Sequence, residues 1–369
     1  MAYTIIDNSE EHFQTTLYTG AGAGQTVTND GNSDLKPDLL WIKRRNAGYA
    51  HALFDSNRGL GSSSPPMLES DSSSAENSNQ NWISGVSTDS FTIGINEQNL
   101  SNTSGTYVAW QWKANGGTTA TNTTGNGIDS TVQANTTAGF SIVTYDGNGT
   151  QTGQTVGHGL GAVPKMIISK DRDATSNVPN WRVYTVGMGN TKYLTLDTDA
   201  AASVFNDWDN TTPTSSVYSV GGDGGYTPTN TNNTEYVAYV FADVQGFSKF
   251  GSYVGNGSGT SDGTFDGPFV YLGFKPAWVL IKRASYSAGD GWVLFDNKRQ
   301  TYNYNQNKLN PASTAAESGA VYDAVDFLSN GFKARTGRAG VNASGSTYIY
   351  AAFAENPFVT STGIPTTAR

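Results

Sequence analysis

The sequence contains no cysteine and only three histidines. Without cysteine there is no disulfide framework and no thiolate metal site. No stretch approaches the run of about 18 apolar residues that a membrane-spanning helix needs, so we expect no membrane insertion. The N-terminus lacks the basic and apolar segments of a secretion signal. These absences suit a protein that is made and assembled in a reducing cytoplasm.

Charge is also scarce, since Asp, Glu, Lys and Arg make up 14% of the chain and the net charge is −9. Phosphate binding requires clustered basic side chains. The longest basic run, Lys43–Arg45, is typical of a strand end beside a polar turn. We therefore expect no nucleic-acid partner.

The chain is rich in glycine (43 residues) and in aromatic side chains (12%). Many turn residues combined with aromatic side chains are typical of β-sandwiches. The aromatic residues provide enough apolar surface to offset the entropy lost on ordering, so we expect a compact fold. A length of 369 residues suggests two or three domains.

Comparison of the chain with itself reveals a repeat. Four segments recur at a constant separation of 241 residues, over more than fifty residues: Leu53–Asp55 as Leu294–Asp296, Ala75–Glu76 as Ala316–Glu317, Phe91 as Phe332, and Tyr107 as Tyr348. A separation held over this distance indicates a duplicated module.

A second shared segment begins with proline and continues as an apolar strand. Residues 36–44 match residues 275–283 at a separation of 239, which places a two-residue insertion in the following loop. Residues 163–170 match the latter segment at a separation of 112, and residues 236–239 precede residues 348–351 by the same number. The middle of the chain is therefore a third, more diverged copy.

These repeats predict an all-β protein of three tandem β-sandwich modules, of jelly-roll or lectin-like type. We place module 1 at residues 1–120, module 2 at residues 121–243 and module 3 at residues 244–369. The proline-led strand is apolar at successive positions, which predicts a central strand buried on both faces. Its proline is expected at the strand start, where no ladder N–H is missed.

The segments Lys36–Arg45, Leu53–Gly59, Ala75–Glu76 and Gly105–Lys113 together resemble a repeat of virion structural and tail-fibre proteins of tailed bacteriophages, particularly those of marine cyanobacteria and related hosts. Residues 342–358 of module 3 resemble the same repeat. Module 2 departs from it, with Thr185-Val186-Gly187 in place of the Phe-Asp pair. The resemblance implies a lectin-like sandwich on the virion and no defined catalytic residues.

On this basis we expect a tail-fibre or tail-associated virion protein, assembled in the host cytoplasm, that contacts other virion proteins and a host surface glycan. A homo-oligomer is expected, with a trimer favoured. A capsid-surface decoration protein without receptor binding is the alternative, because residue 1 leads almost directly into module 1 without a recognisable shaft. A glycan depolymerase is a third, more distant hypothesis.

The sequence predicts no catalytic arrangement. His12, His51 and His158 lie in separate stretches, and no serine has a Gly-x-Ser-x-Gly context. Carboxylate pairs such as those of glycosidases are present as Asp55 with Glu76 and Asp296 with Glu317. Because the pair is copied with the module, a role in folding is the simpler explanation, for instance pairing of Asp55 with Arg58.

Two glycine-rich acidic turns, residues 146–149 and 262–267, have some character of calcium loops but lack the full ligand spacing. They are explained as tight turns, so no metal or cofactor is predicted.

Five aromatic residues lie in polar stretches away from the repeated strands. Aromatic rings beside Asn and Asp are suited to stacking on sugars, although packing of a long loop or contact with a neighbouring subunit is the more common explanation for any single one. These candidate glycan-binding residues are Trp208, Tyr218, Tyr226, Tyr302 and Tyr304.

Overall fold

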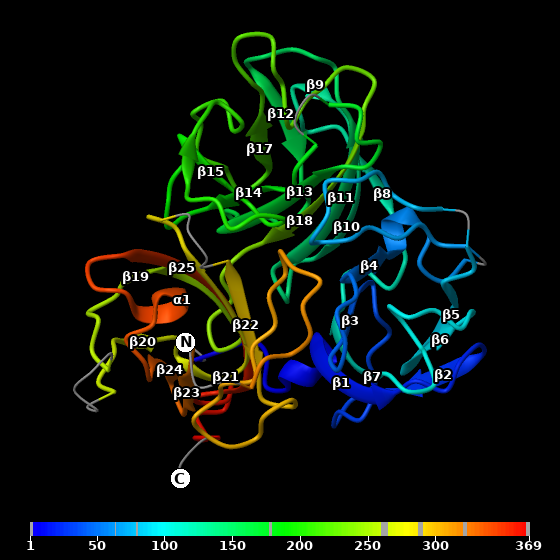
Figure 1. The fold of residues 1–369 in the computed structure, drawn as a ribbon. Coiled ribbons are helices and arrows are strands. Elements are labelled where there is room, and N and C mark those ends of the chain that lie inside the picture. Colours follow the sequence, from blue (N-terminus) through cyan, green and yellow to red (C-terminus); the bar gives the residue numbers. More distant parts are fainter. Residues whose placement is uncertain are drawn as a thin grey trace.

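The computed structural model describes residues 3–62, 64–78, 80–176, 179–259, 265–286, 291–319 and 323–366. It is 41% strand and 3% helix, which confirms the all-β sandwich-type prediction. Figure 1 shows three lobes around a common centre, formed by the N-terminal, middle and C-terminal thirds of the chain.

Each lobe contains one large antiparallel sheet, and the same four-strand order occurs three times. In module 1 the order is β1 (Phe13–Thr19), β7 (Thr106–Trp112), β3 (Leu39–Arg44), β4 (Ala52–Asp55). In module 2 it is β11 (Phe140–Asp146), β18 (Glu235–Phe241), β13 (Met166–Asp171), β14 (Arg182–Thr185). In module 3 it is β19 (Ser248–Val254), β25 (Thr347–Pro357), β21 (Phe274–Arg283), β22 (Trp292–Asp296).

The sheet of module 2 is longer at both edges. One edge adds β15 (Lys192–Thr195) and β16 (Ser203–Val204), and the other adds β10 (Ser130–Asn135) and β8 (Ala120–Asn122). The described residues also form three short helices: η1 (Ser9–Glu11), η2 (Ser56–Arg58) and α1 (Ala339–Asn342).

A small three-stranded sheet accompanies each large one. These are β2 (Gln25–Thr28), β6 (Ser90–Ile93), β5 (Ile83–Ser87) in module 1; β17 (Val217–Val220), β12 (Gln154–Gly157), β9 (Gly127–Ile128) in module 2; and β20 (Phe269–Tyr271), β24 (Gly331–Ala334), β23 (Val325–Leu328) in module 3. The recurring strand orders support the three-module prediction. The boundaries at 120 and 243 stay predictions.

The proline-led strands occupy the predicted central positions. Every residue of β3 and β13 is buried, and each strand lies between two neighbours of its sheet. Pro37 and Pro164 precede these strands, as expected. The expectation is wrong for Pro276, which lies inside β21 where the register shifts. A bulge accommodates proline because the local ladder hydrogen bond is already interrupted.

A pair of stacked tyrosines joins the first and closing strands of each module. The two residues are direct partners in the strand register, and their ring centroids are 5.0 Å apart in all three cases. The pairs are Tyr18 with Tyr107, Tyr145 with Tyr236, and Tyr253 with Tyr348. Repetition of this geometry is strong support for one duplicated module.

Two residues after the first tyrosine, each module requires a glycine. A Cβ added at Gly20, Gly147 or Gly255 would lie 2.1, 2.1 and 2.3 Å from a backbone carbonyl oxygen. The Gly255 N–H also donates to the carbonyl oxygen of Ser346 at 2.9 Å. The chain passes here too closely for any side chain, which explains why the glycine follows the tyrosine in every copy.

We expect the substitution Gly255→Ala to lower the free energy of unfolding by about 1–3 kcal/mol, because the methyl group forces the backbone apart. Chemical denaturation measures this loss. Gly85→Ala is the matched control, since no atom lies within 4 Å of a Cβ at Gly85. Equal effects of the two substitutions would contradict the explanation.

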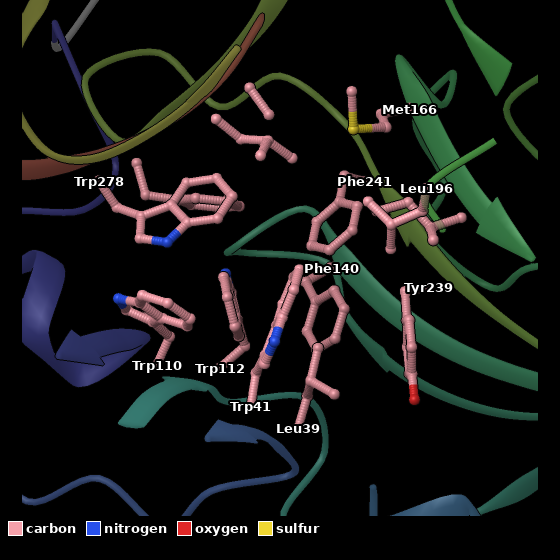
Figure 2. Close-up of a cluster of buried hydrophobic side chains, with 14 of the residues drawn as sticks. Leu39, Trp41, Trp110, Trp112, Phe140, Met166, Leu196, Tyr239, Phe241 and Trp278 are labelled. Atoms are coloured by element: carbon pink, nitrogen blue, oxygen red, sulfur yellow. The ribbon is translucent and has the colours of Figure 1, made fainter. Parts of the chain in front are cut away.

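Apolar side chains form four clusters rather than three. Each module has its own core between its large and small sheets. The fourth cluster draws on the other faces of all three large sheets, including Trp112, Phe241 and Trp278 (Figure 2). A small cavity of about 20 Å³ lies within it, lined by residues of all three lobes. The three lobes therefore share one central core.

Loops of each module bind the large sheet of the next in a cyclic order. The buried lysines at equivalent positions of β3, β13 and β21 each donate to a loop carbonyl oxygen of another module. The bonds are Lys43 Nζ to Thr314 O (3.0 Å), Lys170 Nζ to Ser73 O (3.1 Å) and Lys282 Nζ to Asp199 O (2.8 Å). Module 3 thus contacts module 1, module 1 contacts module 2, and module 2 contacts module 3. We infer a closed ring with approximate threefold symmetry.

Candidate functional site

The carboxylates that resemble a glycosidase pair are held in buried ion pairs between modules. Arg58 Nε lies 2.7 Å from Asp55 Oδ2, as predicted, and its Nη1 lies 3.2 Å from Glu76 Oε2. Arg172 of module 2 contacts the same glutamate at 2.7 Å. Burial alone would raise the pKa of Glu76, but the hydrogen bond from Arg172 and the charge of Arg58 hold it below its usual value. Tyr239 donates its hydroxyl to Asp55 at 2.8 Å.

The same arrangement recurs where module 3 meets module 1. Arg299 contacts Asp296 at 2.5 Å and Glu317 at 3.0 Å, and Arg45 contacts Glu317 at 2.9 Å. Trp110 Nε1 donates to Asp296 at 3.0 Å, in the place that Tyr239 takes in the first cluster. Every carboxylate is engaged by a cation, so we assign these two ionic clusters to the joining of modules.

At the equivalent place in the third interface, between modules 2 and 3, uncharged residues replace the charged ones. Thr185 and Met188 stand where the other modules have the aspartate and arginine, and Ala202 stands at the position of the glutamate. Ala202 N–H donates to the carbonyl oxygen of Ala284 at 2.8 Å, as Glu76 N–H does to Arg172 at 2.7 Å. Met188 and Ala202 pack against the central core. All members of the ionic cluster are therefore replaced together.

The buried histidines are fixed as neutral rings. His158 Nδ1 accepts a hydrogen bond from Leu160 N–H at 3.2 Å, and His51 Nδ1 accepts one from Trp41 Nε1 at 2.9 Å. Both side chains are fully buried. Burial lowers the pKa of His158 to about 4 and that of His51 well below its usual value. These histidines support the fold rather than a catalytic group.

We expect His158 to destabilise the protein as pH falls. The unfolded state binds a proton near pH 6.5 and the folded state only near pH 4, so stability is lost across this window, by about 3 kcal/mol at its lower end. Asp207, whose pKa burial raises to about 6, acts in the opposite direction. The measurement is therefore the difference between wild type and His158→Gln in urea denaturation at pH 7.5 and pH 4.5. An unchanged difference at the two pH values would exclude the neutral assignment.

Two of the five predicted glycan-binding residues are not exposed, so the expectation is wrong for them. Trp208 and Tyr218 are almost fully buried in the core of module 2. Trp208 packs edge-on against Tyr184 at 5.8 Å, and Tyr218 against Tyr145 at 6.5 Å. In the segment Val217–Val220, Tyr218 and Val220 would lie on the same face of a strand. This alternation was the sequence signal that Tyr218 points into the core. The polar neighbours of Trp208 gave no such signal.

The other three are exposed: Tyr226 in module 2, and Tyr302 and Tyr304 in module 3. Tyr302 is 83% exposed. Tyr304 lies beside Phe265, and both line a small cavity of about 90 Å³ together with Arg335. Their glycan-binding role stays a prediction.

Sequence reasoning missed two further aromatic residues, Phe269 and Tyr271 on β20, which are 46% and 52% exposed. Among the described residues, six of the seven exposed Phe and Tyr side chains belong to module 3. The alternation of Phe-Val-Tyr, with only Val270 buried, was the available signal. We define the aromatic surface of module 3 as Phe265, Phe269, Tyr271, Tyr302 and Tyr304.

Hydrogen bonds between Asn148 and Asn230 close the predicted turn at residues 146–149. Asn148 N–H donates to Asn230 Oδ1 at 2.9 Å, and Asn230 Nδ2 returns a bond to Asn148 Oδ1 at 2.8 Å. In the second turn, residues 262–264 lie outside the described residues. Across the part of the chain that the structure describes, no group of three or more His, Asp or Glu side chains is placed to hold a metal ion.

Comparison with known proteins gives one result. No curated protein and no solved structure matches the chain. No helix among the described residues is long and apolar enough to cross a membrane. A model for a domain of unknown function, DUF7483, matches residues 8–357 and thereby spans all three lobes. The chain belongs to the DUF7483 family.

Proposed function

We propose that this chain is a structural protein of a bacteriophage virion, associated with the tail, that contacts the host surface through module 3. The observation that carries the proposal is the concentration of exposed aromatic side chains on one of three otherwise similar lobes. The resemblance of the repeated segments to tail-fibre repeats supports the location. No enzymatic activity is proposed, because Arg58 and Arg299 engage the candidate carboxylates.

Particle imaging tests the location. An antibody against the chain is expected to label the tail of negatively stained particles, and particles that lack the chain are expected to adsorb more slowly to host cells. Labelling of the capsid together with unchanged adsorption would contradict the proposal.

That outcome would favour the alternative of a capsid-surface decoration protein. The compact arrangement of three lobes around a shared core is the observation that favours this alternative (Figure 1). Self-association, for which a trimer is proposed, has to use surfaces outside the ring, because the inner faces of the large sheets are already packed together.

A further inference from the structure

The outer face of the small sheet in module 3 differs sharply from its counterpart in module 1. Phe269 pairs with Lys333, and Tyr271 pairs with Gly331, in the register of β20 with β24. In module 1 the corresponding pairs on β2 and β6 are Thr26 with Thr92 and Thr28 with Ser90. The two hydroxyls of the first pair are hydrogen-bonded at 2.9 Å. Threonine at these positions is therefore compatible with the fold, so the fold does not require the aromatic rings of module 3.

Both rings on β20 are held in place by their neighbours. A Cβ at Gly331 would lie 2.9 Å from Phe269 Cε2, so the phenyl ring extends over a residue without a side chain. Tyr271 is flanked by Lys249, whose Nζ lies 5.1 Å from the ring centroid and donates to the Tyr271 carbonyl oxygen at 2.9 Å. Residues two apart on a strand share a face, so the two rings form one exposed platform about 7 Å in length.

Two cations beside this platform are paired with carboxylates, and a third, Lys249, donates to the Tyr271 carbonyl oxygen. Lys333 forms an ion pair with Asp266 at 2.5 Å, and Arg335 forms one with Asp326 at 3.3 Å. Lys333 and Asp326 occupy the same row of the sheet as Phe269. Two cations paired with two carboxylates fit an uncharged ligand that offers hydroxyl groups, and the carboxylates remain available as acceptors.

We propose that Phe269 and Tyr271 form a binding site for a neutral carbohydrate, with sugar rings stacked on the aromatic platform and hydroxyls bound by Asp266 and Asp326. A protein partner would require about 800 Å² from each side, far more than two rings provide. This proposal rests on the proposed function and names the ligand class for module 3.

The test uses the full chain and arrays of neutral and acidic bacterial surface polysaccharides. The variant Phe269→Thr/Tyr271→Thr introduces the residues of module 1. The control Tyr286→Ser removes an exposed aromatic side chain of module 3 that lies outside the defined aromatic surface. Wild type and Tyr286→Ser are expected to bind the same neutral polysaccharides, and the double variant to bind them at least tenfold more weakly. Melting temperatures show whether each variant is folded.

Because Phe269 also covers Gly331, a second variant separates packing from recognition. Phe269→Leu/Tyr271→Leu keeps apolar area without the flat rings, and it is expected to lose binding as well. Full binding by either double variant would overturn the site while leaving host contact by module 3 intact. Binding of wild type to acidic polysaccharides alone, or to no polysaccharide, would overturn the proposal that the ligand is a neutral carbohydrate. The adsorption of particles to host cells tests the proposed function independently of this result.

Discussion

Replacing Arg299 with methionine is expected to lower the free energy of unfolding by about 3–5 kcal/mol, because it leaves a buried carboxylate without its cation. Asp296 and the Arg299 side chain are both fully buried, and their 2.5 Å contact is the centre of the ionic cluster. Glu317 stays paired with Arg45 at 2.9 Å, so the substitution leaves mainly Asp296 without a cation. Denaturation by guanidinium chloride measures the change.

The third interface, where uncharged residues replace the ionic cluster, suggests a second experiment. The quadruple variant Arg45→Ala/Asp296→Thr/Arg299→Met/Glu317→Ala introduces the residues found at Ala284, Thr185, Met188 and Ala202. It is expected to be more stable than Arg299→Met by about 2 kcal/mol, because no charge of the cluster remains unpaired. A quadruple variant less stable than the single one would show that the charges are needed individually. Lys275→Met, which removes a half-exposed ion pair with Glu355, is the control and should change stability by less than about 1 kcal/mol.

Phe353→Ala is expected to destabilise the whole molecule by about 3–5 kcal/mol in a single unfolding transition. The Phe353 ring contacts aromatic rings from all three modules at centroid distances of 5.3 to 5.9 Å. These rings are Phe13, Trp112, Phe241, Phe247, Phe250 and Trp278. No lobe keeps an intact inner face when this ring is lost.

Calorimetry distinguishes this shared core from three independent domains. Phe353→Leu conserves most of the volume and is expected to lose less than about 1.5 kcal/mol. If Phe353→Ala instead produced a separate low-temperature transition for module 3, with modules 1 and 2 unfolding as before, the central cluster would not join the lobes energetically.

Features within one module could be predicted from the sequence. The buried proline-led strands follow from apolar residues at successive positions, and the pairing of Asp55 with Arg58 follows from their spacing beside a turn. The central core could not be predicted, because Trp112 and Phe241 have the same sequence pattern whether they pack within their module or against another one. Pro276 was misplaced because a bulge leaves no local signal.

The candidate surface was predicted only in part. Tyr302 and Tyr304 were identified from their polar neighbours, which is a sound signal for a loop. The same criterion failed for Trp208, since a loop residue can turn inward and fill the core of its module. Phe269 and Tyr271 were missed because an aromatic residue on a strand is usually interpreted as core. Only the comparison with Thr26 and Thr28 of module 1 shows that the outward rings are additional to the fold.

The arrangement of three lobes within one chain also sets the number of proposed binding sites per chain. In a ring of three identical subunits, every surface occurs three times. In this chain the lobes can differ in sequence. Module 1 has threonines at the positions where β20 has the aromatic platform. The described residues of one chain then contain one such platform. If the proposed function holds, weak binding of a surface glycan would become strong only through several copies of the chain on one particle.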